Sequence, residues 1–158
     1  MDIQQIRNVG IIAHGGAGKT TLAEALLFNA KAVDRLGKVD DGSSNFDFDP
    51  EEIRRKITIG TSFHHYSWNK VEVTLADTPG YTNFEADTRS VLRFLDGAVL
   101  VVNAVSGVEV QTEKMWSLAR AADVPVIGFV SKMDKERADF DKAVAEMSEI
   151  LKVHAVPV

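Results

Sequence analysis

One glycine-rich segment constrains the fold of this chain more than any other feature. The apolar run at residues 9–13 is followed by His-Gly-Gly-Ala-Gly-Lys-Thr at residues 14–20 and then by a helical pattern over residues 21–28. A strand that passes through such a loop into a helix directs backbone N–H groups and the helix N-terminus at one point. This arrangement predicts a binding site for a phosphate chain within an α/β fold.

The rest of the chain alternates short apolar runs with helical patterns. Further strands are predicted at residues 61–68, 71–75, 98–102, 126–130 and 153–158, and helices at residues 85–95, 111–122 and 139–151. Alternation of this kind is typical of βαβ units, and Asn69-Lys70 can join its two flanking strands as a hairpin. We predict one P-loop NTPase domain of the α/β class with helices on both faces. Its sheet is mostly parallel with one antiparallel edge hairpin.

Residues 35–50 lack any periodicity and are rich in Gly, Ser and Asp. A long irregular loop inside a compact domain is more often functional or mobile than idle. The acidic run at residues 47–52 could imitate a metal-binding loop. We expect it instead to be a solvated part of the long loop.

Composition excludes several classes of function. The 158 residues carry a formal net charge of -5, which argues against a broad basic surface for nucleic acid. The absence of Cys excludes disulfides and thiolate metal sites. Residues 1–5 lack the character of a secretory signal, and the apolar run at residues 98–102 is too short to span a bilayer. We expect a soluble, monomeric, cytoplasmic chain without a membrane partner.

The glycine-rich loop supplies the groups that a nucleotide's phosphates need. Lys19 would reach the β- and γ-phosphates, and the Thr20 hydroxyl would ligate Mg²⁺. The other loop residues expected to surround the phosphates are Ala13, His14, Gly15, Gly16, Ala17, Gly18 and Thr21. We expect His14 to make a structural hydrogen bond. An accidental glycine-rich turn is the alternative, which the flanking strand and helix disfavour.

A second motif, Asp77-Thr78-Pro79-Gly80, stands at the end of a predicted strand. Ligand groups in α/β folds lie at such ends. Asp77 could hold Mg²⁺, usually through water, and the Gly80 N–H could turn toward a γ-phosphate. Alone, the tetrapeptide is an ordinary turn about half the time, but downstream of a P-loop the functional interpretation is favoured.

A third motif, Ser131-Lys132-Met133-Asp134, follows the predicted strand at residues 126–130. The Asp134 carboxylate could accept hydrogen bonds from N1–H and the 2-amino group of guanine, while the Lys132 stem lies against the base. As a bare tetrapeptide it more often means a solvated Lys-Asp pair. Its place after the other two motifs favours guanine, and a P-loop ATPase remains the alternative.

Taken together, the motifs resemble the G domain of translational GTPases, most closely elongation factor G and its elongation-factor-G-like relatives. The resemblance covers nearly the whole chain, through residues 7–11, 13–20, 57–59, 77–80, 107–109 and 132–134. It implies a G-protein-like fold that binds GTP, GDP and Mg²⁺. It also implies that Thr58 belongs to a first switch, where its hydroxyl completes the Mg²⁺ shell and its N–H senses the γ-phosphate. Residues 35–50 would belong to the loop that GTP orders, and residues 77–95 would form a second switch.

The chain departs from the family pattern at four positions: Gly16 replaces Asp, Lys56 replaces Gly, Tyr81 replaces His and Ser131 replaces Asn. Because a phenol is a poor base near neutral pH, Tyr81 predicts slow hydrolysis. Ser131 is expected to shorten or lose a contact toward the base and the P-loop. The family's last base-binding motif, a Ser-Ala pair, is absent. We therefore expect an excised N-terminal fragment of an elongation-factor-G-like side branch.

Two hypotheses for function follow. The first is a GTPase, slow in isolation and stimulated by a partner, that acts at the ribosome through the full-length protein; its catalytic groups would be Lys19, Thr58, Gly80 and Tyr81. A ribosome-protection or release factor is a variant of this hypothesis. The second is a GTP-binding regulatory module with little hydrolysis, which Gly16 and Tyr81 favour.

Overall fold

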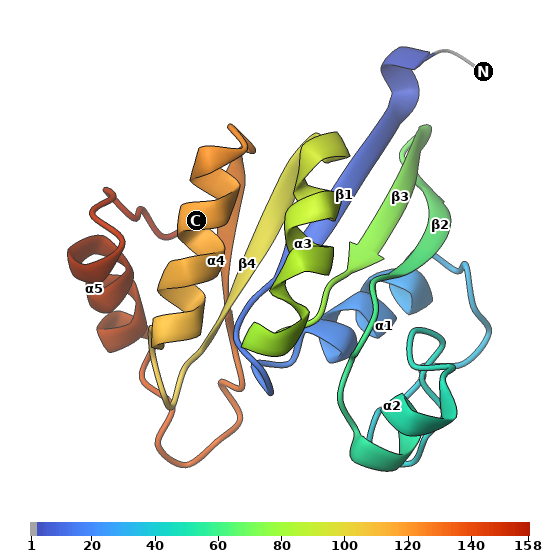
Figure 1. Ribbon diagram of the computed structural model, residues 1–158, viewed down its shortest axis with the longest axis horizontal. Coiled ribbons are helices and arrows are strands. Elements are labelled where there is room, and N and C mark those ends of the chain that lie inside the picture. Colours follow the sequence, from blue (N-terminus) through green and yellow to red (C-terminus); the bar gives the residue numbers. More distant parts are fainter. Residues whose placement is uncertain (1–2) are drawn as a thin grey trace.

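The computed structural model describes residues 3–158, so Met1 and Asp2, which belong to the segment used above to argue against a secretory signal, lie outside the described residues. Its sheet has five strands in the order β2-β3-β1-β4-β5 (Figure 1). The strands are β1 (Ile6–Ile12), β2 (Ser62–Trp68), β3 (Val71–Asp77), β4 (Gly97–Asn103) and β5 (Val126–Ser131). Only β2 and β3 pair antiparallel. The predicted mostly parallel sheet with one edge hairpin is therefore confirmed.

The helices are α1 (Lys19–Asn29), α2 (Pro50–Arg55), α3 (Glu85–Val91), α4 (Val110–Ala121) and α5 (Phe140–Ile150). Short 3-10 turns cover Ile3–Gln5, Thr82–Phe84 and Leu92–Phe94. The helix predicted at residues 85–95 therefore changes to a 3-10 turn in its last part. Its start was predicted correctly.

Helices cover both faces of the sheet, as predicted. On one face, Leu100 and Val102 of β4 belong to a core with residues of α4 and α5. On the other face, Val101 belongs to a second core with Leu27 of α1. This division follows from the alternation of side chains along a strand. In Figure 1, α2 lies at the end of the molecule where β1 runs into α1.

Two elements differ from the sequence predictions. Helix α2 was not predicted; Asp49 and Glu52 form a capping box around its start, with Pro50 in the first turn. The strand predicted at residues 153–158 is wrong. Val153 and Ala155 pack against the core without joining the sheet, and Pro157 has no N–H to donate to a ladder.

None of the helices within residues 3–158 combines the length and apolar character needed to cross a membrane.

Candidate functional site

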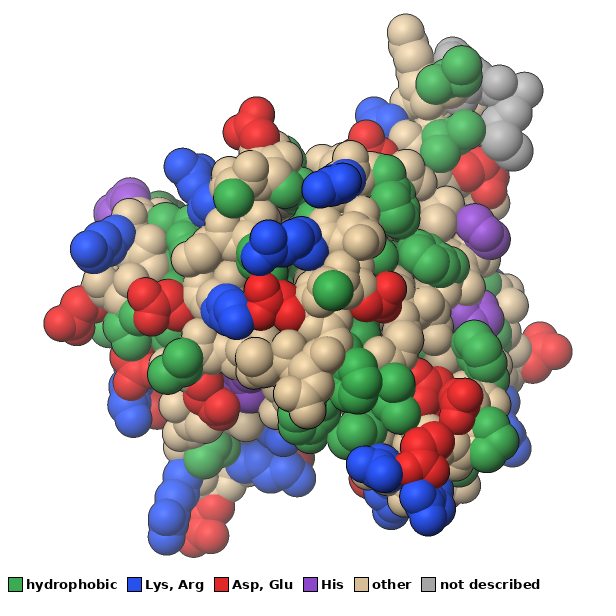
Figure 2. Space-filling model, viewed as in Figure 1, with side chains coloured by type: hydrophobic (Ala, Val, Ile, Leu, Met, Phe, Trp, Pro, Cys, Tyr) green, Lys and Arg blue, Asp and Glu red, His purple; other side chains and the backbone are tan. Residues whose placement is uncertain are grey.

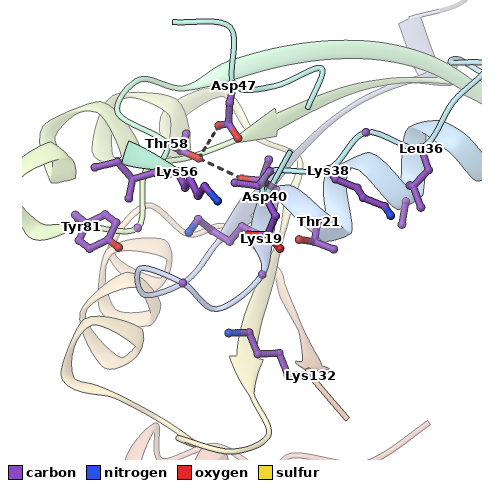
Figure 3. Close-up of a pocket in the computed structure, with 18 residues that line it drawn as sticks. Lys19, Thr21, Leu36, Lys38, Asp40, Asp47, Lys56, Thr58, Tyr81 and Lys132 are labelled. Carbon is purple, nitrogen blue, oxygen red and sulfur yellow. Dashed lines mark hydrogen bonds between the residues drawn. The ribbon is translucent and has the colours of Figure 1, made fainter. Parts of the chain in front are cut away.

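A cleft of about 610 Å³ opens at the carboxyl end of β1 (Figure 3). Most of its lining comes from three segments that are distant in the sequence. They are the glycine-rich loop with the start of α1, the irregular residues 36–40, and the segment around Thr58. Asp47, the Gly80-Tyr81 turn and Lys132 complete the lining. Ligands of open α/β sheets bind at this end of the strands. The cleft is therefore the candidate functional site.

The predicted site residues divide into those that line the cleft and those that support it. The lining residues are Gly16, Gly18, Lys19, Thr20, Thr21, Thr58, Gly80, Tyr81 and Lys132. The supporting residues beneath the cleft include Ala13, Ala17, Asp77 and Thr78, which are fully buried. Of the remaining members, His14 and Pro79 are buried, Gly15 is half-buried, and Ser131 ends β5. Met133 and Asp134 lie in the loop after β5.

The glycine-rich loop packs tightly against the Asp-Thr-Pro-Gly turn. A Cβ atom at Gly80 would lie 2.5 Å from the Lys19 Nζ and 2.8 Å from the Gly15 backbone N. At Gly15, a Cβ atom would lie 2.6 Å from the Tyr81 ring. Only glycine allows these two backbone segments to approach so closely. The loop and the turn, predicted separately, form one wall.

Lys19 is a buried cation that lines the cleft next to this loop and turn. Its Nζ donates a hydrogen bond to the His14 carbonyl at 3.3 Å. Burial lowers the pKa of Lys19, and the carboxyls of Asp77 and Asp47 oppose that shift. A partly desolvated ammonium group interacts strongly with any anion that enters the cleft.

Three segments meet at the hydroxyl of Thr20. This hydroxyl donates to Asp77 Oδ2 at 2.6 Å and lies 3.1 Å from the Thr58 hydroxyl. Thr58 Oγ1 also donates to Asp47 Oδ1 at 3.3 Å. All four side chains are buried. The candidate metal ligands Thr20, Thr58 and Asp77 are thus brought together, with Asp47 as an addition that the sequence had not suggested.

The oxygen atoms of this cluster fit a small divalent cation. Within residues 3–158, Asp77 Oδ1 and Asp47 Oδ2 are buried without a hydrogen-bond partner. Burial raises the pKa of Asp77 to about 7, because desolvation outweighs the opposing charge of Lys19, and burial also raises the pKa of Asp47. Mg²⁺ takes oxygen ligands and accepts a site of one or two carboxylates completed by phosphate and water. Thr20, Thr58, Asp77 and Asp47 could therefore hold it.

His14 serves the structure of the loop, as expected. Its Nδ1 lies 2.8 Å from the Thr112 hydroxyl, and its Nε2 lies 3.2 Å from Glu109 Oε1. Burial lowers the pKa of His14, although Glu109 raises it. The imidazole ties the loop to the start of α4 and does not line the cleft.

Ser131 reaches the glycine-rich loop despite its short side chain. Its hydroxyl donates to the Ala17 carbonyl at 2.7 Å. The contact toward the P-loop is therefore not lost, because the end of β5 approaches the loop closely enough for a hydroxyl, while the expected effect on the contact toward the base stays a prediction. The adjacent Lys132 has a positive φ of 57° and lines the cleft.

Met133 and Asp134 lie at the open edge of the site. The Asp134 carboxylate is exposed and pairs with Lys135 Nζ at 3.1 Å. This local pair lowers its pKa. Neither Met133 nor Asp134 lines the cleft. Reading of a base by Asp134 therefore stays a prediction.

Two buried carboxylates hold the irregular segment in place, and the sequence had not indicated either. Glu24 of α1 accepts hydrogen bonds from the backbone of Gly37 and Asn45 and from the side chains of Ser44 and Asn45. Glu52 of α2 accepts from the backbone N–H groups of Ile59 and Gly60. Glu24 therefore anchors residues 37–45, and Glu52 anchors the segment that follows Thr58.

The expectation that residues 47–52 are solvated is wrong for two of their side chains. Asp47 and Glu52 are buried, at 4% and 3% exposure. Their partners lie in segments up to Gly60, so no pattern within residues 47–52 could reveal their burial. The interruption of periodicity at residues 35–50 and the family resemblance were the signals that this region contributes to the site.

Comparison with known proteins agrees with this geometry. The family model for the elongation factor Tu GTP binding domain matches residues 4–157. The chain is 44% identical over 144 residues to mitochondrial ribosome-releasing factor 2 of Yarrowia lipolytica, covering 91% of this chain and 18% of that protein. It is 42% identical over 156 residues to elongation factor G of Salinibacter ruber, covering 99% of this chain and 22% of that protein.

A solved structure agrees as well. The crystal structure of a Thermus thermophilus protein superposes with a TM-score of 0.88 at 35% identity, over 93% of this chain and 22% of the other. The chain spans about a fifth of the length of these relatives. Fold, cleft and family match agree: the chain belongs to the elongation factor Tu GTP-binding domain family.

Proposed function

We propose that this chain is the GTP-binding and GTP-hydrolysing switch domain of an elongation-factor-G-like translation factor that works at the ribosome. One observation carries the proposal: the buried contacts of Thr20 with Asp77 and Thr58 join the phosphate loop, the end of β3 and the irregular segment at one point. A γ-phosphate bound there would touch all three segments. The names of the relatives, elongation factor G and ribosome-releasing factor 2, support the ribosome as partner.

Binding and hydrolysis would rest on position and charge. Lys19 and the backbone N–H groups of the glycine-rich loop would hold the phosphates, and the Gly80 N–H would face the γ-phosphate. Mg²⁺, held by Thr20, Thr58 and Asp77, would neutralise phosphate charge. A water molecule attacks the γ-phosphorus, the bond to the β-phosphate oxygen breaks, and GDP leaves. Tyr81 stands beside this position and offers a weak acceptor for that water.

The switch would consist of the irregular residues 35–50 together with the segment around Thr58. Within residues 3–158, the hydrogen bonds of the Thr58 hydroxyl join it to side chains of the cluster, at 3.1 Å to Thr20 and 3.3 Å to Asp47. Loss of the γ-phosphate would remove the ligand that completes this cluster, and the segment could then change its conformation.

A regulatory module that binds GTP and hydrolyses little is the second candidate, which Tyr81 and Gly16 favour. Gly16 lines the cleft with a φ of 76°, and because it is glycine it places no side chain near the phosphate site. GTP turnover, measured with and without ribosomes, separates the two candidates. Strong stimulation contradicts a pure binding module. Brisk turnover without ribosomes contradicts the predicted slow intrinsic rate.

The guanine preference is tested by competition. Unlabelled GTP should displace labelled GTP from the protein, and unlabelled ATP should not. Equal displacement by ATP would overturn the assignment in favour of a P-loop ATPase.

The remaining parts of the proposal concern partners and location. On the face seen in Figure 2, Lys and Arg side chains are interspersed with Asp and Glu. Together with the net charge of -5, this supports a chain that makes no broad contact with nucleic acid. A monomer in the cytoplasm belongs to the same proposal.

A further inference from the structure

Lys56 is a cation at the mouth of the cleft that the predicted chemistry did not use. It follows α2 directly and stands two positions before Thr58. It lines the cleft together with Lys19, Thr58, Gly80 and Tyr81. In Figure 3 its side chain extends into the cleft toward that of Lys19.

The backbone of Lys56 adopts a conformation that favours glycine. Its φ of 56° and ψ of 42° lie in the left-handed region, and its N–H donates to the Glu52 carbonyl to end α2. A lysine in this position is strained relative to glycine. Lys31, Lys70 and Lys152 adopt the same backbone region elsewhere in the chain, so the feature that distinguishes Lys56 from these three is that its side chain lines the cleft.

Lys56 forms no ion pair with a carboxylate of the described residues, although Asp40 and Asp47 line the same cleft. By contrast, the charges of its two neighbours in α2 are compensated, because Arg54 and Arg55 both pair with Glu51. Among residues 3–158, no ion pair within 4.0 Å includes Lys56. Two ammonium groups that approach one cleft repel each other unless an anion lies between them.

We propose that Lys56 contacts the γ-phosphate of bound GTP and stabilises the charge that develops on it during hydrolysis. This inference rests on the proposed function. A positive side chain supplied from the same chain is a known way to stabilise the transferring phosphoryl group. Lys56 transfers no proton; the attacking water delivers its proton to the phosphate product. Because GDP lacks the γ-phosphate, Lys56 favours GTP over GDP.

Lys56→Gly is the appropriate test because it removes the ammonium group and relaxes the backbone, so the fold is retained. Lys56→Arg keeps the cation. Arg54→Ala removes one positive charge from the exposed face of α2 and serves as the matched control. Dissociation constants for GTP and GDP in the presence of Mg²⁺ are measured for each protein. Single-turnover hydrolysis of saturating GTP is measured alongside.

Lys56→Gly should weaken GTP binding about tenfold while GDP binding stays the same, and should slow single-turnover hydrolysis by at least about tenfold. Lys56→Arg should retain most of both properties, and Arg54→Ala should change neither. An unchanged ratio of GTP to GDP affinity in Lys56→Gly overturns the inference. The inference is also overturned if Arg54→Ala weakens GTP binding and slows hydrolysis as much as Lys56→Gly does, because that result would show a long-range charge effect. If the unmodified protein binds neither nucleotide, the proposed function itself fails.

Discussion

The phenol ring of Tyr81 lies against Gly15 of the phosphate loop, so closely that a Cβ atom at Gly15 would come within 2.6 Å of the ring. The ring is 43% exposed and lines the cleft. Tyr81 therefore stands between the turn that ends β3 and the phosphate loop. This is where a water molecule would approach a γ-phosphate.

Tyr81→His should raise single-turnover GTP hydrolysis by about tenfold or more, because an imidazole with an unperturbed pKa near 6.5 accepts a hydrogen bond from water more readily than a phenol. Tyr81→Phe is the matched control and should hydrolyse no faster than the unmodified protein. Equal rates for the His and Phe variants would show that Tyr81 does not control the attacking water.

Asp77→Asn should abolish most of the advantage that Mg²⁺ gives to nucleotide binding, since the Thr20 hydroxyl donates its hydrogen bond to this carboxylate. Nucleotide affinity, measured over a Mg²⁺ titration and after chelation with EDTA, checks this. The variant should bind similarly under both conditions. An undiminished Mg²⁺ dependence would remove Asp77 from the metal site.

The same carboxyl predicts a pH effect on the protein without nucleotide and Mg²⁺. Burial raises its pKa to about 7 from an ordinary value near 4, so the folded state binds the proton more tightly than the unfolded state. Stability is therefore lost as pH rises from about 4 to about 7. Because one pKa unit corresponds to about 1.4 kcal/mol, unfolding by urea at several pH values should show a loss of up to about 4 kcal/mol that Asp77→Asn lacks. Parallel profiles for the two proteins would contradict this.

Ser131→Ala should weaken guanine nucleotide binding several-fold. It removes the hydrogen bond at 2.7 Å that links the end of β5 to the Ala17 carbonyl, a contact worth about 1 kcal/mol. Ser90→Ala is a matched control, because the Ser90 hydroxyl bonds only within its own helix, to the Ala86 carbonyl. Isothermal titration with GDP compares the three proteins. Equal affinities would show that the link does not support the loop.

Glu24→Gln should loosen residues 37–45, because an amide offers one acceptor oxygen where the carboxylate offers two. We expect a loss of about 2 kcal/mol in unfolding free energy and faster amide exchange at Gly37 and Asn45. Glu149→Gln on the exposed face of α5 is the control. Unchanged exchange at Gly37 would show that the anchor does not hold the loop.

Asp134→Asn should lower affinity for GTP and raise affinity for xanthosine triphosphate, because an amide matches the altered edge of that base. Competition between the two nucleotides for the protein measures the ratio of the two affinities. Equal loss of both would show that Asp134 does not contact the base. Asp141→Asn, which changes another exposed Asp, should leave both affinities unchanged.

The main elements of the fold were predictable because their signals are local. The apolar run before Gly15 and the helical pattern after Lys19 define β1 and α1 from neighbouring residues alone, and Asn69-Lys70 marks the hairpin in the same way. Helix α2 was harder to predict because it is short and lies inside a polar region. Its capping box, formed by Asp49 and Glu52, was readable from the sequence.

The sequence by itself determined the phosphate loop and the mostly parallel sheet, since both depend on short motifs and on the periodicity of strands and helices. Short motifs also predicted Thr20 and Asp77 as candidate ligands, whereas Thr58 followed only from the family resemblance. Only the tertiary structure decided the burial of Glu24, Asp47 and Glu52. It also decided the reach of Ser131 to Ala17 and the approach of Lys56 to the cleft. These features depend on distances between segments far apart in the chain, such as the 114 positions between Ala17 and Ser131. No local pattern encodes such a distance.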